Sequence, residues 1–229
     1  MEILYEDNHI IIVNKASGEI VQGDKTGDKP LVEILKDFIK ERDSKPGNVF
    51  MGVVHRLDRP VSGVVVFAKT SKALSRLNAM FASGDVHKTY WAITRNRPAE
   101  PQAELRHWIK SVERNNKSYA SPTPSKDAKE ARLAYKLIAS SDRYYLLQVR
   151  LMTGRKHQIR VQLSSVGCPV KGDLKYGDKR SNPDGSISLH ARNIKFVHPV
   201  SGKEIDVTAP VPDDTLWKAL EQNANTATE

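Results

Sequence analysis

Strand-like segments dominate this sequence, and most of them follow one another with no helix between them. They share β-branched and aromatic residues, and they lie at 3–5, 10–13, 64–68, 88–95, 187–197 and 203–208. Strands with short connections pair antiparallel, whereas parallel pairs need a long crossover. The sequence therefore predicts an α+β fold with a mixed, mostly antiparallel sheet.

Helices are expected where apolar residues recur at helical spacing. They begin after Pro30, at Thr70 or Ser71, at Thr153 and near Leu216, and the second ends at Gly84. Residues 131–151 predict a hairpin that turns at 140–143. Residues 114–130 hold few apolar side chains and two prolines, so they predict a surface loop.

Positive charge is in excess, with 36 Lys and Arg against 27 acids. This balance favours a polyanionic partner, nucleic acid before an anionic membrane surface. Residues 143–172 hold no Asp or Glu, and the predicted helix start after Thr153 would favour an anion there. The bases of this stretch are Arg143, Arg150, Arg155, Lys156, Arg160 and Lys171. We interpret the stretch as a phosphate-binding surface, and the alternative is a solvated basic face.

The cellular setting follows from features of the whole chain. Cys168 is the single cysteine, so no internal disulfide is possible. The N-terminus MEILYEDNH carries acids where a signal peptide needs bases, and no apolar run approaches membrane-spanning length. We expect a cytoplasmic protein with no membrane partner, acting as a monomer.

The stretch GVVHRLDRPVSGVVVF places one acid, Asp58, at a bend between two apolar runs. Pro60 restricts the backbone, and alternation along an extended segment would put Arg56 and Asp58 on one face. A nearby arginine keeps a carboxylate ionised, as a nucleophile or base requires. Asp58 is therefore a catalytic candidate, and the alternative is a structural ion pair.

The sequence contains none of the common cofactor or metal motifs: GxGxxG, GxxxxGK[ST], HExxH, CxxC and GxSxG are all missing. Its seven histidines are scattered without metal-ligand spacing. We expect no cofactor and no metal. A metal-dependent nuclease or phosphoesterase, suggested only by scattered His and Asp, is an alternative that predicts inhibition by chelators.

Five ordered motifs resemble the RluA-type pseudouridine synthase family. They are ILYEDNHIIIVNKASG, HRLDRPVSGVVVFAKT, VHKTYWAI, LMTGRKHQIRVQLSSVGCPVKGDLKYG and LHARNIKFVHPVSGKEIDVTAP, and together they span about residues 3–212. The resemblance implies conversion of uridine in structured RNA, ribosomal or transfer, to pseudouridine by base flipping, with no cofactor. It implies a sheet in two halves with a central active-site cleft and flanking helices. We expect a catalytic domain over 1–221 and a disordered tail over 222–229.

The resemblance also implies residue roles. Asp58 matches the catalytic aspartate, and Tyr90 matches the tyrosine that stacks on the target uracil. Arg155 matches the basic residue that pairs with the aspartate. Arg56 matches an arginine that fills the gap left by the flipped nucleotide. We expect RNA contacts from these basic residues: Arg56, Arg59, Arg150, Lys156, Arg160 and Lys171.

Two positions depart from the family pattern, since Ala16 replaces a usual proline and Val61 a usual threonine. No S4-like RNA-binding domain is expected before the first motif, so targeting falls to the catalytic domain. A non-catalytic RNA-binding protein of the same fold is the second alternative. The presence of Asp58, Tyr90 and Arg155 argues against it.

Overall fold

The computed structural model describes residues 1–24 and 26–226 and shows two compact units. Unit 1 consists of residues 1–86 and 193–210, and unit 2 of residues 87–192 and 211–229. Each unit combines helices with antiparallel strand pairs, which confirms the predicted α+β, mostly antiparallel fold. Among the described helices, none combines the length and apolar character that a membrane span requires.

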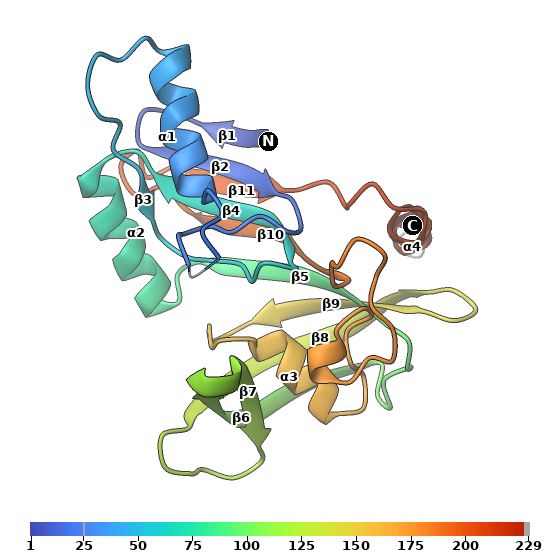
Figure 1. Ribbon diagram of the computed structural model, residues 1–229. Helices are drawn as coiled ribbons and strands as arrows, with labels where there is room; N and C mark the ends of the chain where they lie inside the picture. Colours follow the sequence, from blue (N-terminus) through green and yellow to red (C-terminus); the bar gives the residue numbers. More distant parts are fainter. Residues whose placement is uncertain (25, 227–229) are drawn as a thin grey trace. The chain divides into compact units, whose positions relative to one another are not determined.

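Unit 1 is a sheet that follows the order β1-β2-β4-β10, with β3 beside β4 and β11 beside β10 (Figure 1). Its elements are β1 (Glu2–Glu6), β2 (Ile10–Lys15), α1 (Leu31–Arg42), β3 (Gly52–Val53), β4 (Ser62–Ala68), α2 (Ser71–Ser83) and β11 (Glu204–Thr208). The strand β10 (Leu189–Val197) begins in unit 2 and ends in unit 1.

The core of unit 1 follows from strand alternation. Ile10 and Ile12 of β2 and Val64 and Val66 of β4 point to one face, where Leu77 of α2 packs on them. The helix α2 begins and ends where the sequence predicts: Thr70 accepts the N–H of Ala73, and Gly84 closes it in the left-handed conformation. These elements hold the strand that precedes α2 in a fixed register.

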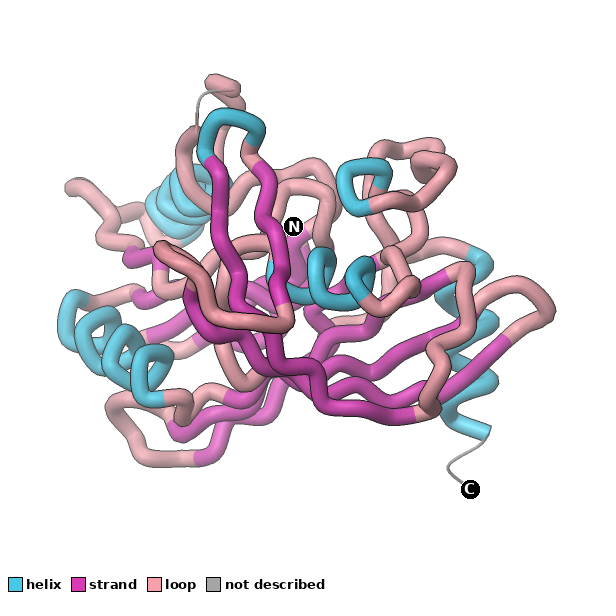
Figure 2. The backbone as a smooth tube through the Cα atoms, turned by 90° about the horizontal axis from the view of Figure 1, so that it is seen from below, coloured by secondary structure: helices cyan, strands magenta, loops and turns pink. Residues whose placement is uncertain are grey.

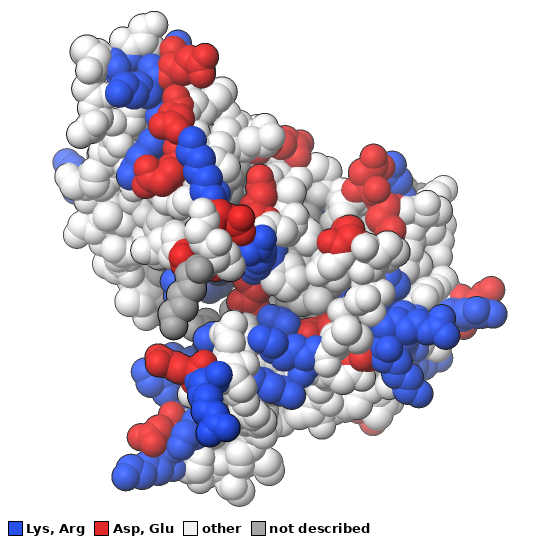
Figure 3. Space-filling view, in the orientation of Figure 1, with Lys and Arg blue, Asp and Glu red and all other residues white. Residues whose placement is uncertain are grey.

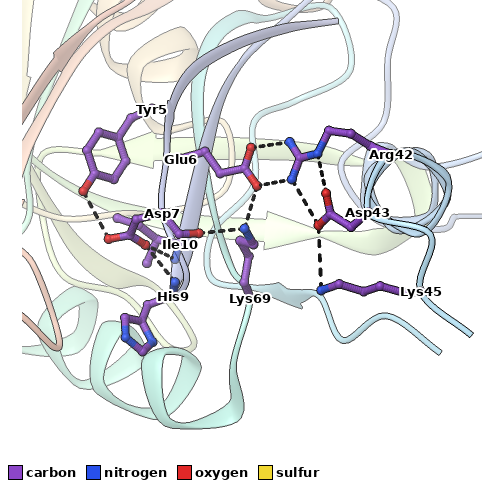
Figure 4. A network of polar contacts seen from close by, with 9 residues as sticks. All are labelled: Tyr5, Glu6, Asp7, His9, Ile10, Arg42, Asp43, Lys45 and Lys69. Carbon is purple, nitrogen blue, oxygen red and sulfur yellow. Dashed lines mark hydrogen bonds and ion pairs between the residues drawn. The ribbon is translucent and has the colours of Figure 1, made fainter. Parts of the chain in front are cut away.

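An ion-pair network fastens the end of β1 to α1 and to the residue after β4 (Figure 4). The Glu6 carboxylate accepts hydrogen bonds from Arg42 at 2.6 and 2.8 Å and from Lys69 at 2.5 Å. The hydrogen bond from Arg42 is the main cause that lowers the pKa of Glu6 to about 2. This network lies at the end of β2 and β4 that is remote from Lys15 and Ser62.

Unit 2 is built on the strand order β5-β9-β8-β6-β7. Its elements are β5 (His87–Thr94), β6 (Gln102–Val112), the 3-10 turn η1 (Glu113–Asn115), β7 (Lys117–Ser121), β8 (Lys129–Ser140), β9 (Tyr145–Leu151), α3 (Gln158–Ser165), the 3-10 turn η2 (Leu174–Tyr176) and α4 (Thr215–Thr226). Figure 2 shows β6 and β7 as a long hairpin with η1 at its tip.

The register of unit 2 gives its sheet two different faces. Tyr90 lies opposite Val149, which lies opposite Tyr135, so these side chains share one face with Ala131. The helix α3 packs on this face, with Val161 against Ala131. The other face carries Trp91 and Lys136 and is partly covered by Trp217 of α4.

Three local predictions are wrong. The helix α3 begins at Gln158 and not after Thr153, because His157 has a left-handed backbone with φ of 56° and the residues before it form a loop. The predicted loop over 114–130 contains the edge strand β7. The helix α4 extends to Thr226, so the predicted tail begins inside a helix, and residues 227–229 lie outside the described residues.

Candidate active site

The loop that carries Asp58 joins β3 to β4 over residues 54–61. Leu57 is buried, whereas Arg56 is exposed and Asp58 half-buried, in a segment that is not a strand. The N–H of Val61 donates to the Asp58 carbonyl at 3.0 Å and closes a turn at Pro60. The carboxylate therefore sits on a short loop that a buried leucine anchors.

His55 fixes the entrance to this loop. Its Nε2 accepts the backbone N–H of Val66 at 3.0 Å, and its ring stacks on Phe81 with 4.8 Å between centroids. A ring nitrogen that accepts this bond must be unprotonated at that position. His55 thus ties the loop to β4 and to α2, a role that the sequence did not indicate.

Lys15 holds the other side of the loop. Its side chain is 1% exposed, and its Nζ donates to the carbonyls of Ala16 at 2.8 Å and Arg59 at 3.2 Å. The N–H of Gly18 also donates to the Arg59 carbonyl, at 2.9 Å. Burial lowers the pKa of Lys15 to about 8, while the charges of Glu19 and Asp58 act in the opposite direction.

Ala16, which stands where the family usually has proline, makes a backbone hydrogen bond that proline could not make. Its N–H, which a proline would lack, donates to a carboxylate oxygen of Glu19 at 2.8 Å. The next residue, Ser17, donates through Oγ to the Pro60 carbonyl at 3.2 Å. Residues 15–18 therefore clamp the loop of Asp58 through backbone carbonyls, with a buried ammonium at the centre of the clamp.

In unit 2, Arg155 lies on a loop that a buried amide organises. Gln158 is 3% exposed, and its Oε1 accepts hydrogen bonds from the Thr153 hydroxyl at 2.8 Å and from the Arg155 N–H at 2.9 Å. Its Nε2 donates to the carbonyl of Arg132 in β8 at 3.0 Å. The exposed Arg155 side chain donates through Nε to the Glu130 carbonyl at 2.8 Å.

The other predicted contacts of unit 2 fall into two sets. Lys156 is exposed beside Arg155, and Lys171 is half-buried with its Nζ 2.6 Å from Oδ1 of Asn182. Arg150 lies opposite Thr89 and Ala134, so its side chain is on the face away from Tyr90. Arg160 is buried in a two-bond pair with Asp173, at 2.6 and 2.9 Å. The geometry favours a structural role for Arg160.

The structure groups the predicted residues by unit. Asp58 shares its loop with Arg56 and Arg59, and Arg59 pairs with Asp28 at 2.7 Å. The 8% exposed Tyr90 lies on the face of unit 2 that α3 covers. Within the described residues, no group of three or more His, Cys, Asp or Glu is placed to hold a metal ion.

Comparison with known proteins places the chain in a family. Residues 9–165 match the model of the RNA pseudouridylate synthase family. The chain is 33% identical to tRNA pseudouridine synthase C of Vibrio vulnificus, over 96% of this chain and 94% of that protein. It is 34% identical to ribosomal large subunit pseudouridine synthase D of Zymomonas mobilis, over 96% of this chain and 73% of that protein.

A solved structure shows the same fold. Human RNA pseudouridylate synthase domain containing 4 superimposes with a TM-score of 0.79 at 23% identity, over 98% of this chain and 93% of that one. The fold and the matched sequence define an RNA-modifying isomerase of the pseudouridine synthase class. The chain belongs to the RNA pseudouridylate synthase family, whose reaction converts uridine in RNA to pseudouridine.

Proposed function

We propose that this protein acts on uridine in a stem-loop of ribosomal or transfer RNA, with Asp58, Tyr90 and Arg155 as its catalytic residues. The match to the family model carries this proposal, because residues 9–165 include all three. Relatives that cover nearly the whole chain include both a transfer RNA enzyme and a ribosomal RNA enzyme, which supports both substrate classes.

The chemistry needs no external reagent. The bond between N1 and C1′ breaks, the uracil turns within the site, and C5 bonds to C1′ while the proton of C5 is lost and N1 gains one. A uridine in a stem must first be flipped out, at a cost of a few kcal/mol. The ionised carboxylate of Asp58 attacks the sugar or the base, or abstracts a sugar proton.

The remaining residues have separate tasks in this proposal. Tyr90 stacks on the flipped base, and its hydroxyl assists removal of the C5 proton. Arg155 supplies the positive partner of Asp58, and Arg56 fills the gap in the stem. Phosphate contacts come from exposed basic side chains, chiefly those of Arg59 and Lys156, and Arg150 and Lys171 are further candidates. Arg160 supports the fold. We propose that the protein works as a monomer in the cytoplasm, without a cofactor.

Pseudouridine mapping on total RNA, with and without this gene, tests the function. We expect one or a few uridines in ribosomal or transfer RNA to lose the modification in the deletion strain. The purified protein should restore them in the extracted RNA, and EDTA should leave that reaction intact. Identical maps, or a product of cleaved RNA, would overturn the proposal.

A further inference from the structure

Unit 2 contains a groove that the roles above do not use. It has a volume of about 410 Å³ and lies between β7, α3 and η2. No Asp or Glu is among the described residues that line it, whereas Lys117 and Lys175 are. Figure 3 shows Lys and Arg side chains gathered over this part of unit 2, with some acids among them. The volume lies in the range of sites that bind small molecules or single ligand groups.

Aromatic and apolar side chains stand exposed at this groove. Tyr119 is 47% exposed and Leu174 is 57% exposed, although both are large apolar residues. The Nζ of Lys117 lies 5.8 Å from the ring centroid of Tyr119 and 5.5 Å from that of Tyr176. A cation between two rings is a cation–π arrangement. The groove therefore offers an aromatic face and positive charge at the same place.

Hydrogen bonds hold several residues of the groove in place. The Asn115 side chain donates to the Tyr119 hydroxyl at 2.8 Å, and the Nζ of Lys175 donates to the Asn116 carbonyl at 3.0 Å. On the floor, the Tyr176 hydroxyl accepts the N–H of Ser118 at 2.8 Å. These contacts limit the motion of the side chains, so binding loses less conformational entropy.

The floor of the groove is joined directly to the Arg155 loop. The hydroxyl of Ser118 donates to the Lys156 carbonyl at 2.8 Å, and Nδ1 of His157 lies 2.7 Å from the Tyr176 hydroxyl. Ser118 and Ala120 of β7 lie on the face of the sheet that also carries Tyr90, whereas Lys117 and Tyr119 alternate with them and line the groove at this edge strand. A strand of RNA that contacts Arg155 can therefore continue into the groove.

We propose that this groove binds a nucleotide flanking the modified uridine, with its base stacked on Tyr119 beside Leu174 and its phosphate held by Lys117 and Lys175. The inference rests on the proposed function for the identity of the RNA. Stacking on an aromatic ring combined with basic side chains is how proteins hold single-stranded nucleotides without sequence readout. The groove would then grip RNA next to the flipped base whatever the neighbouring sequence is.

Binding of labelled RNA to matched variants tests the groove. The probes are a uridine dodecamer and a dodecamer of the same backbone without bases. Tyr119→Ala should weaken binding of the uridine dodecamer by at least about fivefold and leave the affinity for the base-free strand unchanged. Lys117→Ala and Lys175→Ala should each weaken binding of both strands. Each should also reduce the magnitude of the slope of log K against log salt by about 0.7.

Lys136→Ala is the matched control, because it removes one exposed positive charge from β8 opposite Gln102, at the end of β6 far from Lys110, which pairs with Tyr119. It should leave both affinities unchanged, and all variants should melt near the wild-type temperature. Equal affinity of Tyr119→Ala and wild type for the uridine dodecamer would overturn the proposal. Displacement of that dodecamer by a decaglutamate peptide, with no effect of Tyr119→Ala on the RNA, would assign the groove to an acidic protein partner instead.

The chemical step separates this inference from the function itself. On RNA from the deletion strain, Tyr119→Ala should need a higher RNA concentration to reach half of its maximal single-turnover rate, in proportion to its loss of affinity. If the wild-type protein forms no pseudouridine, the proposed function fails. The binding of the two dodecamers still shows whether the groove binds a nucleotide. A rate loss at saturation in Tyr119→Ala, with unchanged affinity, would contradict a role in binding flanking RNA.

Discussion

The two loops that carry the proposed catalytic groups are held by opposite means. In unit 1, a buried ammonium, that of Lys15, binds the backbone of the Asp58 loop. In unit 2, a buried neutral amide, that of Gln158, binds the backbone of the Arg155 loop. The negative charge of Asp58 favours the charged form of Lys15, whereas the neutral amide of Gln158 brings no charge toward the arginine. Each clamp thus suits the charge of the group that it positions.

Among variants at positions other than Asp58, the largest effect is expected from Arg155→Ala. Removal of the guanidinium should lower the single-turnover rate by about 100-fold, in the range found for loss of one preorganised charged or polar group. RNA affinity should change by only a few-fold, since we propose that other basic residues contact phosphate. Quench-flow kinetics and filter binding measure the two quantities. Loss of affinity with an unchanged rate would reassign Arg155 to phosphate contact.

Lys15→Met tests the clamp of unit 1. The change keeps the apolar stem and removes the hydrogen bonds to the Ala16 and Arg59 carbonyls. Displacement of the Asp58 loop should lower the single-turnover rate by about 100-fold or less, the cost of a misplacement on the order of 1 Å. Relief of the buried charge offsets the lost hydrogen bonds, so the melting temperature should change little.

Lys69→Met is the control for this variant. Lys69 is also a shielded lysine of unit 1, but it follows the far end of β4 and pairs with Glu6 (Figure 4). Its loss should lower the melting temperature and leave the single-turnover rate at saturating RNA unchanged. Equal rates for Lys15→Met and Lys69→Met would show that Lys15 does not position Asp58.

Gln158→Leu tests the clamp of unit 2 and should have a smaller effect. It leaves the Arg155 N–H, the Thr153 hydroxyl and the Arg132 carbonyl without their amide partner. Solvent reaches part of this exposed loop, so we expect a rate loss of about tenfold and a loss of about 1–3 kcal/mol in stability. Single-turnover kinetics and urea unfolding measure both. A rate loss as large as that of Arg155→Ala would show that the amide acts on more than one catalytic group.

The smallest effect is the part of the pH dependence of stability that comes from Lys15. The unfolded chain keeps the Lys15 proton up to a pKa near 10.5, whereas the folded protein releases it near 8. The unfolded state therefore binds more protons between these values, and the free energy of unfolding should rise with pH in that window. Urea titrations at pH 8 and 10 should show a larger rise in wild type than in Lys15→Met. Equal rises would contradict a buried, charged Lys15.

The sequence was sufficient where the signals are local. Thr70 and Gly84 bound α2 as predicted, and the hairpin of β8 and β9 turns where Ser140 and Arg143 lie. The sequence was insufficient where a residue far away in the chain determines the local structure. The helix start at Gln158 depends on a side chain that reaches back to Thr153 and across to β8. The strand β7 has few apolar residues because it is an edge strand.

The same limit applies to the site. The family motifs identify Asp58, Tyr90 and Arg155, since each stands in a recognisable run of residues. The burial of Lys15 has no local signal, because one of the two carbonyls that it binds belongs to Arg59, 44 residues further along the chain. The burial of Arg160 was missed for a similar reason, since its partner Asp173 follows a loop. Charge counts alone do not separate a buried arginine from one that contacts phosphate.

Asp58→Asn tests the central claim most directly. The substitution keeps the shape of the side chain and removes its negative charge, and an amide is a poor nucleophile and a poor base. We measure tritium release from [5-³H]uridine RNA in a single turnover, with melting temperature and RNA affinity as controls. The account predicts a folded protein that binds RNA at least as well as wild type and releases no detectable tritium. Release at near wild-type rate from the folded variant would contradict a catalytic Asp58.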